Sequence, residues 1–391
     1  MDGVPFPFSY RAAAERVAQR SGERAERSTL PAFDDEYAGA WPLTTLSFHR
    51  SPRAYCTTPR AETDAAAAGL RSYSSEIRNL IRHAQAVPAP KSAATEKAAP
   101  AAVTKPIRIF STALATFEVV ESYGGDAVAK GLAAGVNVVR DQSNGRVYVE
   151  KLLALSTPTE HARALAEVDA LTQLRTAGEP TYINRMVESF VGVGGPFGHL
   201  ILEHCNAGTA YDMIKRRSLA GEQPVEALIW HALAGLSKAV FFCHTGVDAD
   251  QMDWREPQEW NTLCHLDVKP INVFFSHDGG RNGFPRLVLG DFGCATTWKD
   301  IQDGTAKRTV QLYGMPTDVW QMGGVMQAIA RLMTLPELTS VVRRRACGRL
   351  YSRELNDVVS SCMDPDPLKR PTAGQVAREV KKQMEARGLI F

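Results

Sequence analysis

The sequence predicts an α+β fold in two parts, a small antiparallel sheet that carries one helix and a larger part that is mostly helical. Two observations predict it. From residue 116 to about residue 205, short β-branched runs and glycine or Asn-Gly turns surround a single helical pattern. After Gly208, apolar residues recur mainly at helical spacing. We therefore expect a strand-rich small lobe followed by a helical lobe.

The small lobe begins with three predicted strands and a hairpin turn at Ser143–Arg146, where Asn-Gly favours a tight reversal. A helix follows at 159–175, because Leu165, Val168, Leu171 and Leu174 recur at steps of three and four residues. Two further strands complete the lobe. The predicted strands span 117–123, 136–141, 146–155, 185–193 and 199–205.

The helical lobe contains four long segments that each carry an apolar stripe. They span 225–244, 317–333, 351–363 and 372–388. Between them, residues 276–285 are rich in glycine and asparagine and are predicted to form a hairpin loop. Residues 248–261 are a polar insertion with two tryptophans, which we expect to pack locally.

Residues 1–105 differ in composition from the rest of the chain. They are rich in Ala, Arg, Ser, Glu and Pro and offer little apolar periodicity for a core. We expect this region to be largely disordered, with transient helices at 12–27 and 74–87.

Composition also bounds the location and the partners of the protein. No stretch approaches the roughly 20 apolar residues that cross a bilayer, and the N-terminus lacks a basic region followed by an apolar run. The seven cysteines are scattered, which suggests neither a disulfide framework nor a zinc site. A net charge of +2 does not imply a nucleic-acid or membrane partner. We expect a cytoplasmic or nuclear protein without a nucleic-acid or membrane partner.

The strongest chemical signal is the segment HLDVKPINVFF. It brings Asp267, Lys269 and Asn272 into one loop. A base near an acceptor hydroxyl, a cation for the transferring phosphoryl group and a magnesium ligand are what phosphoryl transfer requires. Nineteen residues beyond Asn272, the segment LVLGDFGCA ends an apolar strand with Asp291, whose carboxylate could hold a hard cation. In this order and spacing, chance is a poor explanation.

With these two motifs the chain resembles the eukaryotic protein-kinase superfamily, whose catalytic loop reads H-R-D-L-x-x-x-N and whose magnesium loop reads D-F-G. The resemblance spans about residues 117–387, with a small lobe at 117–205 and a helical lobe at 206–387. It implies a bilobal kinase fold, Asp267 and Lys269 as catalytic residues, Asn272 and Asp291 as Mg²⁺ ligands, and ATP as the phosphoryl donor.

The resemblance also places Lys151, which ends an alternating strand, at the position of the ATP-binding lysine. Glu167, sixteen residues later in the predicted helix, would pair with it. The family further implies Leu202 as gatekeeper and the backbone of Glu203 and Cys205 as adenine partners. The remaining implied nucleotide contacts are Gly131, Val136, Val149 and Phe274, and His265, Phe292 and Leu171 would stack as a hydrophobic spine.

Two later segments, DVWQMGG and CMDPDPLKRPTA, resemble the central and closing helices of protein kinases rather than of small-molecule kinases. In them, Asp318 would cap the backbone of the catalytic loop, and Arg370 would be structural. A lysine two residues after Asp267 resembles the serine/threonine type. The partner expected is a protein substrate with a Ser or Thr acceptor.

The sequence departs from the family pattern at three places. Ala129 and Ala134 occupy glycine positions of the glycine-rich loop, and Leu266 replaces the arginine before the catalytic aspartate. Only 27 residues separate Asp291 from Asp318, without an A-P-E motif, so the substrate shelf is shortened and Arg370 lacks its usual glutamate. Two functions remain open: a serine/threonine protein kinase, or a pseudokinase or scaffold that binds nucleotide or partner proteins without efficient transfer.

Overall fold

The structure is a computed structural model, and it describes residues 108–112, 114–123, 133–192, 195–250, 260–304, 314–336 and 344–391. The predicted disorder and helices within residues 1–105, and the predicted roles of Gly131 and Ala129, lie outside the described residues.

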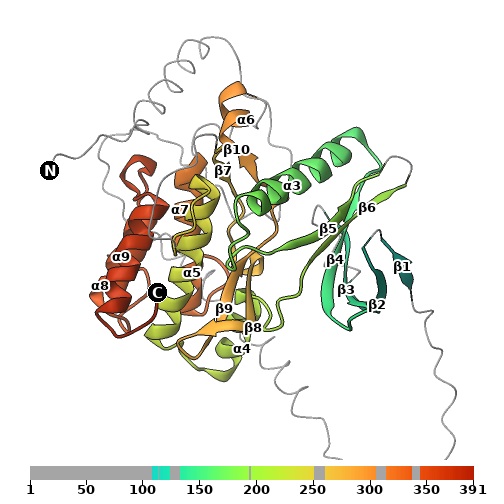
Figure 1. The fold of residues 1–391 in the computed structure, drawn as a ribbon. Coiled ribbons are helices and arrows are strands. Elements are labelled where there is room, and N and C mark those ends of the chain that lie inside the picture. The colour runs from blue at the N-terminus through green and yellow to red at the C-terminus, as the bar shows by residue number, and fades with distance from the viewer. Residues whose placement is uncertain are drawn as a thin grey trace, which may run out of the picture. The chain divides into compact units, whose positions relative to one another are not determined.

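The small lobe is built on a six-stranded antiparallel sheet with the order β1-β2-β3-β4-β6-β5. Figure 1 shows the sheet with helix α3 beside it. The first strand, β1, precedes the first strand expected from the sequence. The strands are β1 (Ile109–Ser111), β2 (Thr116–Tyr123), β3 (Ala133–Asp141), β4 (Val147–Ala154), β5 (Met186–Phe190) and β6 (Phe197–Glu203).

Local sequence explains the turn and the helix of this lobe. In the predicted hairpin between β3 and β4, Asp141 accepts hydrogen bonds from Ser143 and Asn144, and Gly145 takes the left-handed conformation with φ 72°. Helix α3 (Pro158–Thr176) begins with a capping box in which Thr157 and Glu160 satisfy each other's backbone amides.

Strand register sorts the side chains of the sheet onto two faces. Val136 pairs with Lys151, and Val149 pairs with Leu202, so these residues share one face. The intervening Glu150 belongs to the opposite face. There Phe117, Val139 and Ile201 form a small core of their own. The face that carries Lys151 is the one that meets α3 through Glu167.

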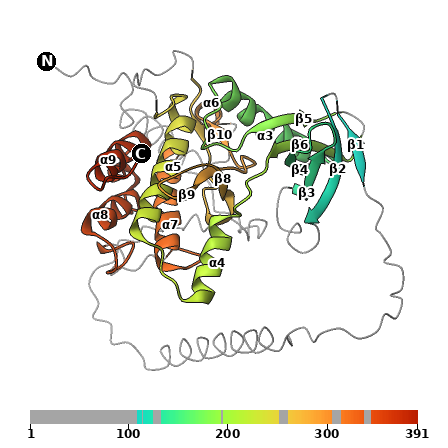
Figure 2. The ribbon, with the colours of Figure 1, turned by 60° about the horizontal axis from the view of Figure 1, so that its bottom comes forward.

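The larger lobe is mostly helical, as predicted. Figure 2 shows α5 and α7 next to each other, with α8 and α9 packed outside them. The helices are α4 (Ala210–Ala220), α5 (Glu226–Thr245), α6 (Trp298–Asp303), α7 (Gly314–Arg331), α8 (Arg353–Cys362) and α9 (Ala373–Glu385). Two short two-stranded sheets accompany them, one of β7 (Leu263–Cys264) with β10 (Thr296–Thr297) and one of β8 (Val273–Arg281) with β9 (Phe284–Leu289).

Residues 276–285 correct one sequence expectation. They are not a long loop, because β8 continues to Arg281 and β9 begins at Phe284. Only Asn282 and Gly283 connect the strands, with φ 55° and 76°. Asn-Gly favours this two-residue turn. The glycines before it, which suggested a loop, lie within the strand.

Helix α5 is the centre of the larger lobe. Sixteen of its 20 residues are buried, among them Trp230 and Phe242. By length and composition this helix could span a bilayer, contrary to the sequence expectation, but 83% of its most apolar window is buried inside the protein. A buried core helix passes the same test. Trp260, from the polar insertion, packs on α5 and donates a hydrogen bond to the carbonyl of Cys243 at 3.1 Å.

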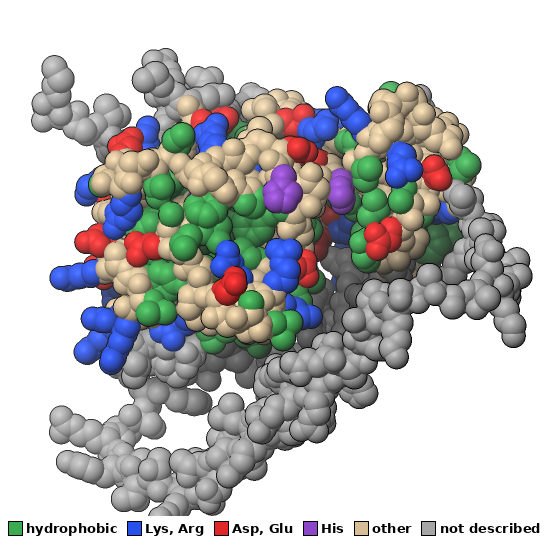
Figure 3. Space-filling model, turned by 90° about the horizontal axis from the view of Figure 1, so that it is seen from below, with side chains coloured by type: hydrophobic (Ala, Val, Ile, Leu, Met, Phe, Trp, Pro, Cys, Tyr) green, Lys and Arg blue, Asp and Glu red, His purple; other side chains and the backbone are tan. Residues whose placement is uncertain are grey.

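The fold agrees with the α+β expectation of a small antiparallel lobe and a helical lobe. On the face shown in Figure 3, Lys and Arg side chains are interspersed with Asp and Glu side chains. This mixture matches the small net charge of +2.

Candidate functional site

The loop after β7 brings three of the predicted site residues together. Lys269 Nζ lies 2.9 Å from Asp267 Oδ2, and Asn272 Nδ2 donates to the same oxygen and to the Asp267 carbonyl, both at 3.0 Å. A short 3-10 turn, Pro270–Asn272, brings the amide back to the aspartate. Asp267 is 9% exposed, and this burial raises the pKa of its carboxyl, although Lys269 opposes the shift.

Asp318 on α7 binds the backbone of this loop. Its carboxylate accepts hydrogen bonds from the backbone amides of His265 at 2.9 Å and Leu266 at 2.7 Å, and from His244 Nε2 at 2.9 Å. Leu266 has φ 64°, a left-handed conformation that costs a residue with a side chain about 1–3 kcal/mol. The two amide bonds fix this backbone. Asp318 thus occupies the capping position that the sequence predicted.

Gln321, one turn later on α7, makes a second set of bonds to the same loop. Its Oε1 accepts from the Val268 amide, and its Nε2 donates to the Leu266 carbonyl, both at 2.9 Å. The sequence analysis did not single out Gln321. Its spacing of three residues from Asp318 places both side chains on one helix face, and this spacing could have identified it.

Lys151 joins the two lobes. Its Nζ lies 2.7 Å from Glu167 Oε1 on α3 and 2.7 Å from Asp291 Oδ1. The predicted pair of Lys151 and Glu167 is therefore formed, and the carboxylate of the second motif completes it. Burial alone would lower the pKa of Lys151, but the charges of Asp291 and Glu167 outweigh it and raise the pKa. The amine is fully protonated at neutral pH.

The two carboxylates of this cluster differ in their environment. Burial raises the pKa of Glu167, which is 3% exposed. Burial acts on Asp291 in the same direction, but the charge of Lys151 outweighs it and lowers the pKa. The Asp291 side chain is 40% exposed. The carboxyl therefore stays ionised at neutral pH and is partly open to solvent.

His265 and Phe292 pack against each other beneath this cluster. Their ring centroids lie 4.7 Å apart with the planes at 61°, as the predicted spine requires. His265 Nε2 donates to the Gly290 carbonyl at 3.1 Å, so it also connects the loop after β7 to the residues that follow β9. Leu171 of α3 and Phe292 belong to the same buried core.

The residues present suit a magnesium ion. Asn272 uses its amide nitrogen for Asp267, and among the described residues no hydrogen bond engages its Oδ1. Asp291 uses Oδ1 for Lys151, which leaves Oδ2. Mg²⁺ typically takes one or two side-chain oxygens and completes its shell with water and phosphate. Within the described ranges, no group of three or more His, Cys, Asp and Glu residues forms a different metal site.

The predicted purine contacts lie on the sheet face of Lys151 and on β8. Val136, Val149 and Leu202 share the Lys151 face, and all are half-buried. Phe274 is also half-buried. Its ring packs closely on Gly290, because a Cβ added at that glycine would lie only 2.8 Å from the ring. Glu203 ends β6, and Cys205 follows it. Burial raises the pKa of the Cys205 thiol to about 12, so this residue is not a reactive thiol.

Arg370 finds partners other than the missing glutamate. Its guanidinium donates to the carbonyls of Asp364 at 2.8 Å and Pro316 at 2.9 Å. It therefore anchors the first turn of α7, which carries Asp318. These backbone carbonyls could not be identified from sequence spacing.

Glu150 is the centre of a buried polar cluster that the sequence analysis missed. Its side chain is fully buried on the outer face of the sheet, and its carboxylate accepts from Asn137 at 2.7 Å, from His199 Nδ1 at 2.7 Å and from Arg108. Burial would raise the pKa of Glu150, but the three donors outweigh it and lower the pKa. In an alternating strand, a glutamate reads as a solvated residue, so no sequence signal identified this cluster.

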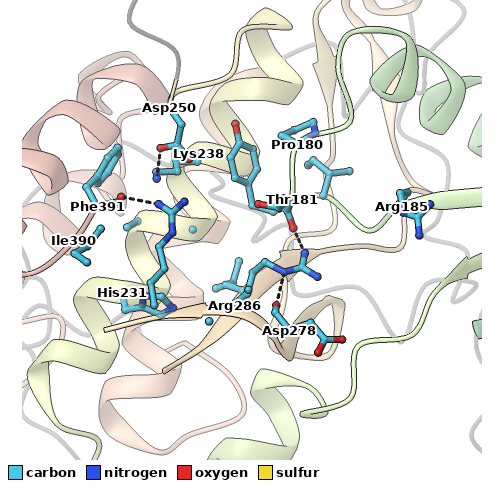
Figure 4. Close-up of a pocket in the computed structure, with 18 of the residues that line it drawn as sticks. Pro180, Thr181, Arg185, His231, Lys238, Asp250, Asp278, Arg286, Ile390 and Phe391 are labelled. Carbon is cyan, nitrogen blue, oxygen red and sulfur yellow. Dashed lines mark hydrogen bonds and ion pairs between the residues drawn. The ribbon is translucent and has the colours of Figure 1, made fainter. Parts of the chain in front are cut away.

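A cavity of about 580 Å³ is lined in part by Glu203, and Lys151, Glu167 and Asp291 do not line it. We call it the rear cavity. Figure 4 shows Lys238 paired with Asp250, and Arg286 directed at the carbonyls of Thr181 and Asp278. Arg281 donates to the Phe391 carbonyl at 3.2 Å. Lys238 and Arg286 are paired with acids, at 2.5 Å in each case. The cavity lining is therefore charge-balanced.

Comparison with known proteins gives a consistent result. The family model described as protein kinase domain matches residues 125–380. The chain is 25% identical over 277 residues to the probable serine/threonine-protein kinase nek2 of Dictyostelium discoideum, covering 64% of this chain and 60% of that protein. It is 24% identical over 288 residues to the G2-specific protein kinase nimA of Emericella nidulans, covering 65% and 40%.

A third relative, the serine/threonine-protein kinase Nek1 of Toxoplasma gondii, is 25% identical over 297 residues, which cover 67% of this chain and 17% of that protein. The chain thus spans from about a sixth to three fifths of the length of these three relatives.

Proposed function

The chain belongs to the protein kinase family, and we propose that it transfers the γ-phosphate of ATP to Ser or Thr hydroxyls of proteins. The observation that carries the proposal is the cluster of Lys151, Glu167 and Asp291, formed across 140 residues of sequence at 2.7 Å distances. The relatives named as serine/threonine kinases support the choice of acceptor.

In this proposal, the acceptor hydroxyl attacks the γ-phosphorus, its proton passes to Asp267, and ADP leaves. Burial raises the pKa of Asp267, which makes its carboxylate a stronger proton acceptor. Lys269, 2.9 Å from Asp267, supplies positive charge where the transferring phosphoryl group gathers negative charge. The bonds from Asp318 hold the loop in place before substrate arrives.

Lys151 would contact the phosphates of ATP, and Asn272 and Asp291 would hold Mg²⁺. When bound, the ion neutralises charge on the phosphates. Glu167 keeps Lys151 oriented towards the cleft. We further propose that the backbone of Glu203 and Cys205 and the side chains of Val136, Val149, Leu202 and Phe274 bind the purine.

A reducing compartment, cytoplasmic or nuclear, is part of the proposal. The six cysteines that the structure describes are all free thiols. Protein substrates, rather than nucleic acid or membrane, are the proposed partners, and the mixed charge in Figure 3 supports this view.

Transfer of labelled phosphate from ATP and Mg²⁺ to generic basic proteins and to the chain itself tests the proposal. We expect transfer by the wild type and a loss of about 10²–10⁴-fold in Asp267→Asn, because the general base is removed. Asp357→Asn, at an exposed position on α8, serves as the matched control and should retain full activity. If the wild type binds ATP but transfers no phosphate, the pseudokinase alternative replaces the enzyme.

A further inference from the structure

Asn184 places a polar side chain at the inner wall of the proposed purine site. Its backbone amide donates to the Leu289 carbonyl at 2.8 Å, just ahead of Gly290 and Asp291. A Cβ at Gly290 would lie 3.0 Å from the Asn184 Cβ, so the two residues are packed tightly. Asn184 is 6% exposed. Its position is therefore fixed between the end of β9 and the end of β6.

The amide of Asn184 is only half used. Its Nδ2 donates to the Glu203 carbonyl at 3.3 Å and lies 3.6 Å from Cys205 Sγ. Its Oδ1 is buried and has no hydrogen-bond partner among the described residues. A buried acceptor without a donor is unfavourable, because it has lost its hydrogen bonds to water and has no protein hydrogen bond in their place. The site therefore offers an acceptor that lacks its donor.

The contact between Asn184 and Glu203 indicates which ligand group could donate to Asn184 Oδ1. Glu203 supplies the carbonyl that would accept from the exocyclic amine of adenine, and Asn184 Nδ2 already lies within hydrogen-bond distance of that carbonyl. Oδ1 of the same amide lies next to it. An amine at carbon 6 of a purine has two N–H groups, enough for both acceptors.

We propose that Asn184 Oδ1 accepts the second hydrogen bond from the 6-amino group of adenine, which makes Asn184 a specificity residue for 6-aminopurine nucleotides. This inference rests on the proposed function. Guanine carries an oxygen at carbon 6, which would face the Glu203 carbonyl and Asn184 Oδ1 as a third acceptor. A site with unpaired polar groups discriminates strongly against a ligand that leaves them unpaired.

Arg185 provides a matched control. It follows Asn184 in the chain, lines the rear cavity and is exposed, as Figure 4 shows. Its contact with β6 is made by its backbone carbonyl, which accepts from the Glu203 amide at 2.9 Å. Replacing the Arg185 side chain with alanine keeps that bond and leaves the purine wall unchanged.

The test compares the dissociation constants of ATP and of purine riboside triphosphate, which has hydrogen in place of the 6-amino group, both with Mg²⁺. Asn184→Leu preserves the branched shape and removes the amide. We expect the preference for ATP over the analogue to fall about three- to tenfold in Asn184→Leu, the effect of one neutral hydrogen bond, and to be unchanged in Arg185→Ala. If Asn184→Leu does not fold, Asn184→Ala is measured in its place.

Two outcomes separate this inference from the proposed function. An unchanged preference in Asn184→Leu overturns the inference while leaving ATP binding intact. A lower melting temperature of the nucleotide-free variant, together with an unchanged preference, would show that Oδ1 serves the fold through buried water instead. Failure of the wild type to bind ATP overturns the proposed function itself.

Discussion

Replacing Asp318 with alanine should destabilise the protein more than any substitution of an exposed acid. The carboxylate is fully buried and accepts three hydrogen bonds, two from the backbone of the catalytic loop and one from His244. Alanine would leave two backbone amides and a histidine without their acceptor. It would also remove the hydrogen bond from the amide of Leu266 to Asp318 Oδ1, which holds Leu266 at its unfavourable φ of 64°.

The magnitude follows from these contacts. A hydrogen bond to a charged group contributes about 1.5–3 kcal/mol, and breaking a buried charged network typically costs about 3–5 kcal/mol. Partial relaxation of the loop offsets some of the sum of three bonds. We therefore expect Asp318→Ala to lower the free energy of unfolding by about 3–5 kcal/mol, a large share of the stability of an ordinary domain.

Urea unfolding followed by tryptophan fluorescence measures this difference. Asp357→Ala is the control, because Asp357 is 62% exposed and its pair with Arg353 is a surface contact, worth at most about 1 kcal/mol. A loss below about 1 kcal/mol in Asp318→Ala would refute the view that Asp318 supports the catalytic loop.

Three further predictions address metal, thiol and pH. Asp291→Ala should remove the dependence of ATP affinity on Mg²⁺, measured by titration calorimetry with and without the ion; equal dependence in both proteins would contradict its role as a ligand. Cys294, whose pKa burial raises to about 11, should react with iodoacetamide at neutral pH roughly a hundredfold more slowly than an unperturbed thiol, as mass spectrometry can follow. Glu150→Gln should be less stable than the wild type at pH 7. Because the pKa of Glu150 is lower in the folded state than its ordinary value of 4.5, the stability it adds is lost as pH falls through the folded value, and the two unfolding curves should converge in acid. A constant difference down to pH 2 would argue against this charge effect.

The main features of the site were predictable because they depend on short motifs. The contact of Lys151 with Glu167, the cap from Asp318 and the packing of His265 on Phe292 each follow from residues that stand at recognisable positions in the sequence. Helices α3, α5, α7, α8 and α9 were predictable because each carries an apolar stripe whose period is set by helix geometry. The shorter helices α4 and α6 were not predicted.

The features that were missed depend on contacts between distant residues. Glu150 is buried because Arg108, just before β1, and donors from β3 and β6 surround it, and no periodicity within β4 reveals them. The position of Asn184 in the proposed purine site is visible only from its contacts with Glu203 and Gly290, which are distant in the sequence. The strand at residues 276–281 was taken for a loop because glycine composition outweighed its pairing with β9.

The cluster around Glu150 has a consequence for where this unit starts. Arg108 and Phe110, before the first strand that the sequence predicted, cover Glu150 and stack on His199. The two faces of β4 therefore make different contacts. Lys151 lies on the face that meets α3, and Glu150 binds Arg108, Asn137 and His199 on the opposite face. A polypeptide trimmed to begin at Phe117 would carry an acidic group in the outer layer of its sheet with two of its covering side chains gone. A polypeptide that begins at Arg108 would keep both of these side chains.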